Sequence, residues 1–474
     1  MNQTRRDNHR FYSFHLPTLI FSFLLSGLVT VVALRAPSIS KPAAFMAGIF
    51  VLAALLWTTE ALPLFATSLL IIALEILFLA NPGGWEILAT TPKLALDYKT
   101  VFAWAADPVL VLFFGGFLLA RAAIKTGLDQ AMSGQILKRF GTRPRFILMG
   151  VMGVTALFSM WMSNTATTAM MIALIAPIVS QVAPGDRFRK ALILSVPFAA
   201  NIGGLGTPIS SPPNAVALGF LRNVGIHVDF LEWMLVAIPL MALMLLFTWI
   251  LLGIFFRPTA QGLRLQISET PIDRTGWFVV VVFFLTVLLW LTDAWHGLPA
   301  SVVALVPVVA FTAGRVLNRE DLNHIDWATL ILIGGGIALG AGMQASGLDQ
   351  VILGILPRGG DSLPILAAIL VFATMTFSTF MSNTAAANLL LPIGVSAGLA
   401  LGGDSTLCLV FSIALSASLA MVLPISTPPN AIAYSQGEFS RKEMAFLGAM
   451  IGGLGAGLIV GFAGLILRLF GLAA

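Results

Sequence analysis

The sequence predicts an all-α polytopic membrane protein with about 11 transmembrane helices in two inverted-topology repeats. Its composition, the spacing of its apolar runs and a set of duplicated motifs lead to this fold class. Of the 474 residues, 58% are hydrophobic and 10% are charged, whereas soluble domains average about 25% charged residues. Most of the surface is therefore expected to face lipid. Each repeat is also expected to contain one re-entrant hairpin and one broken helix.

Apolar runs recur at lengths that suit helices crossing a bilayer, each of which needs roughly 20 residues. Such runs lie at residues 16–34, 109–123, 233–256, 279–291 and 447–467. The first follows a polar stretch that contains Arg5, Arg6 and Arg10, and it lacks a small-residue cleavage site. Residues 1–40 are therefore predicted to form a cytoplasmic N-terminus and a retained first transmembrane helix.

The basic residues predict the orientation. With the N-terminus in the cytoplasm, the cytoplasmic segments hold 19 of the 26 Lys and Arg residues. These segments are 1–10, 121–145, 186–190, 257–275, 315–326 and 438–443. Because cytoplasmic loops carry an excess of Lys and Arg, we expect a multi-pass protein of a bacterial-type inner membrane. The same scatter of charge gives no surface for nucleic acid.

Three short motifs occur twice in the same order, which indicates an internal duplication. The pairs are residues 126–130 (TGLDQ) and 346–350 (SGLDQ), 162–166 and 381–385 (both MSNTA), and 211–215 (SPPNA) and 427–431 (TPPNA). A weaker echo relates Trp57 to Trp290. The two repeats are predicted to span residues 41–256 and 276–474. Each holds about five full spans, an odd number, so the second repeat is expected to be inverted relative to the first.

The Ser-Asn-Thr triplets interrupt apolar segments and predict the tips of the two hairpins. The first hairpin, at about residues 145–183, has basic runs on both flanks, so it is expected to enter from the cytoplasm. The second, at about 362–400, is flanked by Arg358, Asp361 and Asp404 without a basic run and is expected to open to the other side. The two tips would then meet near the middle of the bilayer.

The two Pro-Pro-Asn segments predict the broken helices, at about residues 190–221 and 405–435. Each proline pair removes two amide donors and cannot continue a helix. Irregular backbone at membrane depth is tolerated where it lines a cavity or is buried in protein. Helix N-termini at such breaks attract anions, and free carbonyl ends coordinate cations.

Neutral groups make up the Ser-Asn-Thr triplets and the Pro-Pro-Asn segments, which contain no Arg, Lys, His, Asp or Glu. Anion recognition would therefore depend on amides, hydroxyls and helix ends. A proton relay normally leaves an ionisable residue in the membrane, whereas Na⁺ needs only neutral oxygens. Na⁺ is therefore the expected coupling ion, and no cofactor is expected.

Other conspicuous residues have structural interpretations. Glu60, Glu75 and Asp293 are interpreted as helix caps at the membrane interface rather than as coupling carboxylates. The glycines from Gly334 to Gly342 are expected to allow close helix packing, because no phosphate-loop Lys follows them. The five histidines lack metal-ligand spacing and Cys408 is the only cysteine, so no components of an enzyme site are visible.

These motifs resemble those of the divalent anion/sodium symporter family, whose paired Ser-Asn-Thr triplets and Ser-Pro-Pro or Thr-Pro-Pro breaks look like the ones quoted above. The similarity extends from about residue 45 to the end of the chain. The resemblance implies a homodimer whose transport part moves past a scaffold in an elevator-like motion. It also implies substrate contacts at Ser163, Asn164, Thr165, Ser211, Pro212, Ser382, Asn383, Thr384, Thr427 and Pro428.

The same resemblance implies two Na⁺ sites, one in each repeat. The first would use Ser159, Ser163, Asn164 and Ser210. The second would use Ser378, Ser382, Asn383 and Ser426.

The leading hypothesis is Na⁺-coupled uptake of C4-dicarboxylates such as succinate, malate or fumarate, with one triplet for each carboxylate. Na⁺-independent exchange of di- or tricarboxylates, and transport of another oxyanion such as sulfate, remain alternatives at this stage. A channel is disfavoured, because opposed hairpins build an alternating-access site more naturally than a continuous pore. A membrane enzyme is disfavoured because no nucleophile, metal set or cofactor motif is found.

Overall fold

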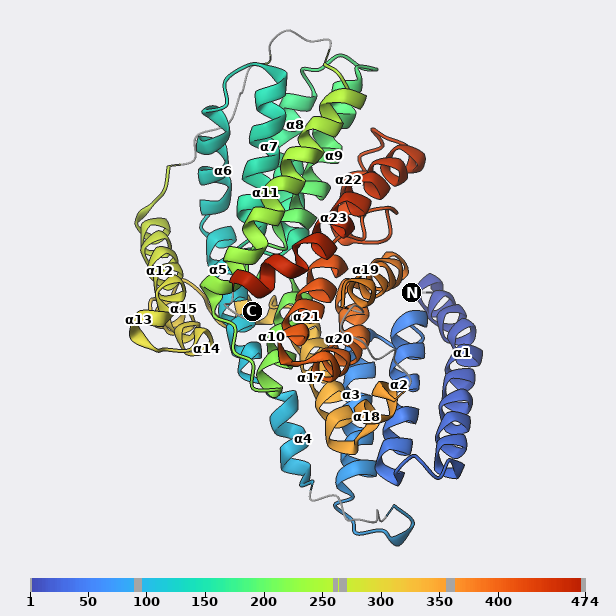
Figure 1. Cartoon of the computed structure of the whole chain (residues 1–474). Coiled ribbons are helices and arrows are strands. Elements are labelled where there is room, and N and C mark those ends of the chain that lie inside the picture. The colour runs from blue at the N-terminus through green and yellow to red at the C-terminus, as the bar shows by residue number, and fades with distance from the viewer. Residues whose placement is uncertain (1, 89–95, 259–262, 264–270, 355–362, 470–474) are drawn as a thin grey trace.

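The computed structural model describes residues 2–88, 96–258, 263, 271–354 and 363–469, and every regular element among them is a helix (Figure 1). In this part of the chain, nine helices are long and apolar enough to cross a membrane. Shorter apolar helices accompany them, including both arms of the first hairpin. The predicted fold class, an all-α polytopic membrane protein, is confirmed.

The first half of the chain begins with a helix that covers the predicted N-terminal span. Its elements are α1 (Asn2–Arg35), α2 (Lys41–Thr59), α3 (Leu64–Glu75), the π-helix η1 (Ile76–Ala80), the 3-10 helix η2 (Glu86–Leu88), α4 (Tyr98–Ala105), α5 (Pro108–Lys125), α6 (Leu128–Lys138), α7 (Pro144–Ser159), α8 (Asn164–Val179), α9 (Arg187–Gly203), α10 (Pro212–Asn223) and α11 (Phe230–Phe255). Figure 1 shows α7, α8, α9 and α11 side by side at one end of the molecule, and α1, α2 and α3 together nearer the other end.

The second half follows a similar order of long, paired and broken helices. Its elements are α12 (Arg274–Leu291), α13 (Asp293–His296), α14 (Ala300–Val303), α15 (Leu305–Ala313), α16 (Arg319–Asn323), α17 (Trp327–Ser346), α18 (Leu348–Leu353), α19 (Leu363–Phe380), α20 (Asn383–Leu401), α21 (Gly403–Ala417), α22 (Pro428–Tyr434) and α23 (Arg441–Leu469). Two points stay predictions. One is the division of the chain into an N-terminal part (1–40) and two repeats (41–256 and 276–474), and the other is the orientation in the membrane.

Each Ser-Asn-Thr triplet lies where two helices meet, as the hairpin prediction requires. Ser163 caps α8 by accepting a hydrogen bond from the Ala166 amide (3.2 Å), and Ser382 caps α20 by accepting one from Ala385 (3.1 Å). Serine is a preferred N-cap because its oxygen satisfies an amide that the first helical turn leaves free. Arg358 and Asp361, which flank the second hairpin, and the side chain of Asp404 lie outside the described residues.

Each Pro-Pro-Asn segment begins a short helix after an irregular loop. The first loop joins α9 to α10 and the second joins α21 to α22. Pro212 and Pro428 occupy the first helical positions, where a missing N–H costs nothing and the fixed φ of proline suits a helix. The broken helices are therefore interrupted by their own sequence.

The glycine run in α17 allows close helix packing, as predicted. A Cβ at Gly335 would lie 2.3 Å from Cβ of Ser68 in α3, and a Cβ at Gly340 would lie 1.8 Å from the ring of Phe220 in α10. A Cβ at Gly336 would lie 2.0 Å from Oδ1 of Asn388 in α20. Real Cβ atoms do not approach so closely, so these positions need glycine. Helix α17 thereby contacts α3 on one side and both α10 and α20 on another.

The weak tryptophan echo corresponds to two equivalent contacts. The indole N–H of Trp57 donates to the Leu64 carbonyl (3.2 Å), and that of Trp290 donates to the Ala300 carbonyl (2.9 Å). Leu64 and Ala300 are the first residues of α3 and α14. The two buried tryptophans thus attach the end of α2 to the start of α3 and the end of α12 to the start of α14.

The interpretation of Glu75 as an interfacial cap is wrong. Glu60 caps the exposed end of α2 and Asp293 accepts from the amides of Phe230 and Ala294, as expected for caps. Glu75, however, is fully buried, because the helix continues past it as the π-helix η1. Its carboxyl faces Gly342 of α17, and neither oxygen has a hydrogen-bond partner among the described residues.

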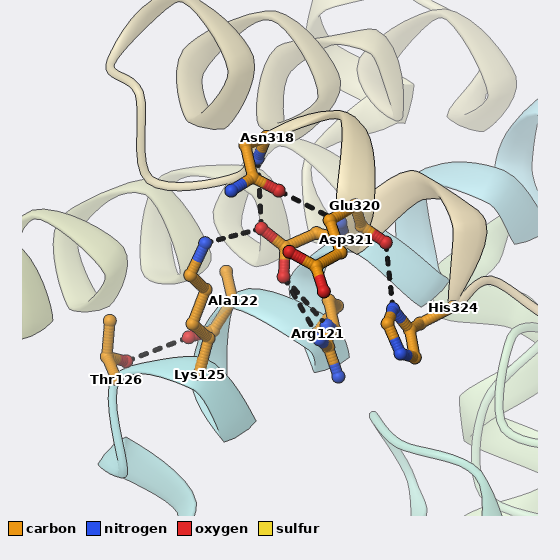
Figure 2. Close-up of polar contacts among 8 residues, drawn as sticks. All are labelled: Arg121, Ala122, Lys125, Thr126, Asn318, Glu320, Asp321 and His324. Atoms are coloured by element: carbon orange, nitrogen blue, oxygen red, sulfur yellow. Dashed lines mark hydrogen bonds and ion pairs between the residues drawn. The ribbon is translucent and has the colours of Figure 1, made fainter.

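A compact ion-pair cluster joins the C-terminal end of α5 to α16 (Figure 2). The buried carboxylate of Asp321 contacts Lys125 and accepts from Arg121 Nε (3.1 Å) and from the Asn318 amide (2.9 Å). Burial of Asp321 opposes ionisation, but Lys125, the Asn318 amide and Arg121 outweigh it and lower the pKa of Asp321 from its ordinary value. The cluster therefore stabilises the fold while Asp321 is ionised.

We predict that Asp321→Asn lowers the stability of the purified protein by about 1–2 kcal/mol at neutral pH. Because the pKa is lower in the folded state, this contribution is present above the unfolded-state pKa of about 4 and is lost as pH falls through the folded-state value. Thermal unfolding in detergent measures the effect. The neighbouring exposed Glu320→Gln is the control, and equal melting temperatures for Asp321→Asn and wild type at pH 7 would contradict the prediction.

Candidate functional site

A cavity of about 240 Å³ lies where both triplets and both Pro-Pro-Asn segments meet. It is lined by all of the predicted substrate contacts, which come from widely separated parts of the sequence: Ser163, Asn164, Thr165, Ser211, Pro212, Ser382, Asn383, Thr384, Thr427 and Pro428. Ser210 and Ser426, predicted for the Na⁺ sites, also line it, whereas Ser159 and Ser378 lie just behind it. The structure thus brings the duplicated motifs together, while the roles of these residues stay predictions.

A serine behind each hairpin tip holds the asparagine of the triplet in place. The hydroxyl oxygen of Ser159 lies 2.7 Å from Asn164 Oδ1 and 2.8 Å from the Ala200 carbonyl oxygen. The Nδ2 group of Asn164 has no hydrogen-bond partner in the part of the chain that the structure describes, so it remains a donor for a ligand.

The second hairpin repeats this arrangement. The hydroxyl oxygen of Ser378 lies 2.6 Å from Asn383 Oδ1 and 2.6 Å from the Ala417 carbonyl oxygen. A hydroxyl donates one proton only, so it can satisfy one of its two oxygen neighbours at a time. Behind each triplet one hydroxyl proton therefore lies between two acceptor oxygens, and in the first hairpin the Ala200 oxygen also accepts from the Gly204 amide (2.9 Å).

The first irregular loop is held by side chains that satisfy its carbonyls. The Ser210 hydroxyl lies 2.7 Å from the carbonyl oxygens of both Gly204 and Thr207. Asn214 Nδ2 donates to the same two carbonyls, at 3.0 and 2.8 Å. These contacts keep buried backbone hydrogen-bonded where the helix is interrupted.

The second irregular loop uses fewer side chains. Asn430 Nδ2 donates to the Leu423 carbonyl (3.0 Å), as Asn214 does at the corresponding Thr207. The Ser426 hydroxyl instead donates to the Thr379 carbonyl (3.1 Å), at the position related to Met160. In the first loop the Met160 carbonyl accepts a hydrogen bond from the hydroxyl of Thr207, at 2.6 Å. Leucine at position 423 has no hydroxyl, so Ser426 takes over this role.

Asn201 connects the two halves of the site and was not predicted. It is buried in α9, lines the cavity, and donates from Nδ2 to Thr427 Oγ1 and to Asn430 Oδ1, both at 3.2 Å. Ser211 and Ser418 form a second contact between the halves, at 3.2 Å. The sequence signal was one amide within an apolar helix just before a break. Asn201 could have been identified because a buried polar side chain needs a hydrogen-bond partner.

Asp326 is the other residue that sequence reasoning missed. It lines the cavity, it is exposed, and it is the only ionisable side chain among the described cavity-lining residues. Helices α8, α20 and α10 also begin at this cavity. Because helix N-termini carry partial positive charge and free amides, the interior of the cavity suits an anion although it contains no cation.

A larger cavity of about 600 Å³ lies elsewhere and contains none of the triplet residues. It is lined by Arg222, His227, Asp229 and Asp293, among others. Burial and the nearby charge of Asp293 raise the pKa of Asp229, and His227 opposes that shift. Two carboxyl groups thus line this second cavity, whereas Asp326 supplies one to the cavity that holds the triplets.

Residues 18–471 match the family model described as sodium:sulfate symporter transmembrane region. The chain belongs to this family. The resemblance to divalent anion/sodium symporters drawn from the motifs is therefore confirmed. Family membership identifies a multi-pass membrane transport protein, in agreement with the apolar helices.

Characterised and uncharacterised relatives align over most of the chain. The sodium-dependent dicarboxylate transporter SdcS of Staphylococcus saprophyticus is 30% identical, over 96% of this chain and 92% of that protein. SdcS of Staphylococcus aureus (strain USA300) is 31% identical, over 87% and 85% respectively. An uncharacterized transporter of Schizosaccharomyces pombe is 31% identical over 95% of this chain. The chain spans about half, 53%, of that yeast protein.

Two solved transporters share the fold at low sequence identity. The YdaH transporter of Alcanivorax borkumensis superposes with a TM-score of 0.56 at 14% identity, over 87% of this chain and 98% of that one. MtrF of Neisseria gonorrhoeae superposes with a TM-score of 0.54 at 11% identity, over 79% and 83%. These likenesses support the fold alone.

We predict that Gly204→Ala disrupts the first hairpin tip, because the added Cβ would lie 2.6 Å from Asn164 Nδ2 and 2.7 Å from its Oδ1. Overpacking of this kind destabilises proteins by about 1–3 kcal/mol. Thermal unfolding in detergent measures the loss. The matched control is Gly253→Ala in α11, where a Cβ meets nothing within 4 Å; a Gly204→Ala melting temperature as high as that of the control would contradict the close approach.

Proposed function

We propose that this protein is a secondary active transporter that carries C4-dicarboxylates such as succinate, malate and fumarate together with Na⁺. The observation that supports this most strongly is the single cavity in which two Ser-Asn-Thr triplets, one from each half of the chain, lie together. Each triplet can supply a hydroxyl and an amide donor to one carboxylate. The names of the SdcS relatives, which are sodium-dependent dicarboxylate transporters, point to the same substrate class.

The size of the cavity agrees with a small metabolite. Its volume of about 240 Å³ is below the roughly 300–1,000 Å³ of pockets for drug-sized ligands. Two separate donor groups suit an anion with a charge at each end better than a compact tetrahedral oxyanion, which one group could hold. A C4-dicarboxylate is therefore favoured over sulfate.

Na⁺ is the proposed coupling ion because neutral oxygens gather behind each triplet. Ser159 Oγ, Asn164 Oδ1 and the Ala200 carbonyl oxygen form such a group, and the hydroxyl proton can satisfy only one of the other two oxygens. A cation placed among them would bind lone pairs that these hydrogen bonds leave free, since the Ala200 oxygen accepts from the Gly204 amide (2.9 Å) as well. The first site is proposed at Ser159, Ser163, Asn164 and Ser210, and the second at Ser378, Ser382, Asn383 and Ser426.

Na⁺ binding would also assist the substrate indirectly. A cation behind a triplet adds positive charge next to the anion cavity and holds the asparagine with its Nδ2 directed to the ligand. Anion and cation binding would then favour each other, as a coupled transporter requires. No ionisable side chain within the triplets is needed for this coupling.

We further propose that the site is exposed alternately to the two sides of the membrane by an elevator-type movement in a homodimer. The glycine-lined contacts of α17 with α10 and α20 would let these helices slide at close range. In the proposed orientation the N-terminus is cytoplasmic, and the exposed Asp326 is the last residue of the cytoplasmic segment 315–326. The cavity would therefore open to the cytoplasm in this structure.

Uptake into liposomes tests the proposal. The purified protein is reconstituted and labelled succinate uptake is measured with an inward Na⁺ gradient, with K⁺ in place of Na⁺, and with or without internal unlabelled succinate. We expect uptake that needs Na⁺ and no internal substrate. Uptake that needs internal dicarboxylate and ignores Na⁺ would instead establish anion exchange and contradict both Na⁺ sites. Uptake of labelled sulfate without any uptake of labelled succinate would contradict the substrate class.

Asn164→Ala and Asn383→Ala are each predicted to lower succinate uptake by at least about tenfold, because each removes a charge-assisted hydrogen bond to a carboxylate. Asn223→Ala, at the exposed end of α10 and outside the cavity, is the matched control. Equal amounts of folded protein are verified by size-exclusion chromatography. Wild-type uptake by either cavity variant would contradict the assignment of its triplet.

A further inference from the structure

Two helices of the chain begin with an aspartate at corresponding positions of the two repeats. Asp107 precedes α5 and Asp326 precedes α17, and they are separated by 219 residues, the same interval as the Ser-Asn-Thr triplets. Each caps its helix. Asp107 accepts from the Val109 amide (2.8 Å), and Asp326 accepts from the Thr329 amide (3.0 Å). Helix capping therefore explains why an aspartate is present at both positions.

The surroundings of the two carboxylates differ in a way that capping does not explain. Asp107 is buried and its charge is neutralised by Arg222, whose Nη1 lies 2.9 Å from Oδ1. Asp326 is exposed at the cavity that holds both triplets, and it has no cationic partner in the described ranges of the chain. Its second oxygen accepts only from the neutral Thr329 hydroxyl, at 2.6 Å. One member of the pair is neutralised, and the other keeps its charge at the mouth of the site.

An unpaired carboxylate at the mouth affects cations and anions in opposite ways. The other described cavity-lining side chains carry no charge, so the field of Asp326 is not cancelled locally. It raises the local concentration of Na⁺ and repels each carboxylate of an entering substrate. At a separation on the order of 10 Å and a dielectric between those of protein and water, each additional substrate charge costs about threefold in affinity.

We propose that Asp326 is a specificity-determining residue that selects substrates by charge, favouring Na⁺ entry and dianionic dicarboxylates over trianionic tricarboxylates. This inference rests on the proposed transport function and deepens it. The charge of Asp326 would distinguish dicarboxylates from tricarboxylates, both of which the neutral triplets alone would accept. The role belongs to the charge of Asp326, whereas the helix cap needs only its oxygen.

Asp326→Asn separates these two roles, because asparagine keeps an acceptor for the Thr329 amide and loses the charge. The probes are glutarate and tricarballylate at pH 8, which share a three-carbon backbone and differ by one carboxylate. Each is titrated as an inhibitor of labelled succinate uptake in proteoliposomes at low and at high ionic strength. The half-saturating Na⁺ concentration is measured in parallel.

We expect Asp326→Asn to raise the inhibitory affinity of tricarballylate, relative to that of glutarate, by about threefold at low ionic strength. The increase should be smaller at high ionic strength because salt screens exposed charges. The half-saturating Na⁺ concentration should rise. Asp326→Glu, which keeps the charge, should behave like wild type, and Asp107→Asn should leave the ratio unchanged. An unchanged ratio in Asp326→Asn, or an equal change in Asp107→Asn, would overturn the proposal.

A binding measurement distinguishes failure of this inference from failure of the proposed function. Thermal stabilisation of the detergent-solubilised protein by glutarate and by tricarballylate gives the same ratio without transport. If wild type takes up no dicarboxylate, the transport proposal fails, and the ratio still decides the role of Asp326. If neither anion stabilises wild type, both proposals fail.

Discussion

The structure depends on satisfying irregular backbone that is buried in the protein interior. Residues 204–211 are buried, and backbone hydrogen bonds of the turn type pair only some of their amides, such as those of Gly206 and Ser210. Ser210 and Asn214 supply partners for the Gly204 and Thr207 carbonyls, and the indole of Trp233 donates to the Leu205 carbonyl at 3.0 Å. An unsatisfied peptide group in an apolar setting costs several kcal/mol. The interruption in the helix therefore persists because side chains fixed in the sequence complete its hydrogen bonds.

The same requirement produces a site without a cation. Side chains that satisfy backbone are short and neutral, and within the described residues they leave a few donors without a partner, such as Nδ2 of Asn164 and of Asn383. In the proposed function, a cavity whose interior is lined by neutral groups would bind its anion without a strong ion pair, so the anion could be released again after transport. The negative charge of Asp326 at the mouth then adjusts which ions enter, while Arg222 removes the equivalent charge of Asp107.

The motifs were predictable from the sequence because duplication marks them. Ser163 and Ser382 cap helices where the hairpin tips were expected, and Pro212 and Pro428 begin short helices after the breaks. These features depend on local rules of capping and proline geometry. Local rules are readable without knowledge of the tertiary structure.

Features that depend on distant partners were missed. Asn201 looked like one amide in an apolar helix, and its partner Thr427 lies 226 residues away. Glu75 was assigned to a helix end because the sequence does not show that a π-helix continues beyond it. Asp326 was read as part of a connecting segment, although it has the same interval to Asp107 as the triplets have to each other. Applying the repeat interval to every charged residue would have identified it.

The central claim is that the anion lies between the two triplets in the neutral cavity. A cryo-EM map of the reconstituted protein with succinate and Na⁺ tests it most directly. The account predicts ligand density bounded by Asn164 and Asn383, with cation density beside Ser159 and Ser378. Density for succinate in the larger cavity beside Arg222 and His227, with the neutral cavity empty, would contradict it.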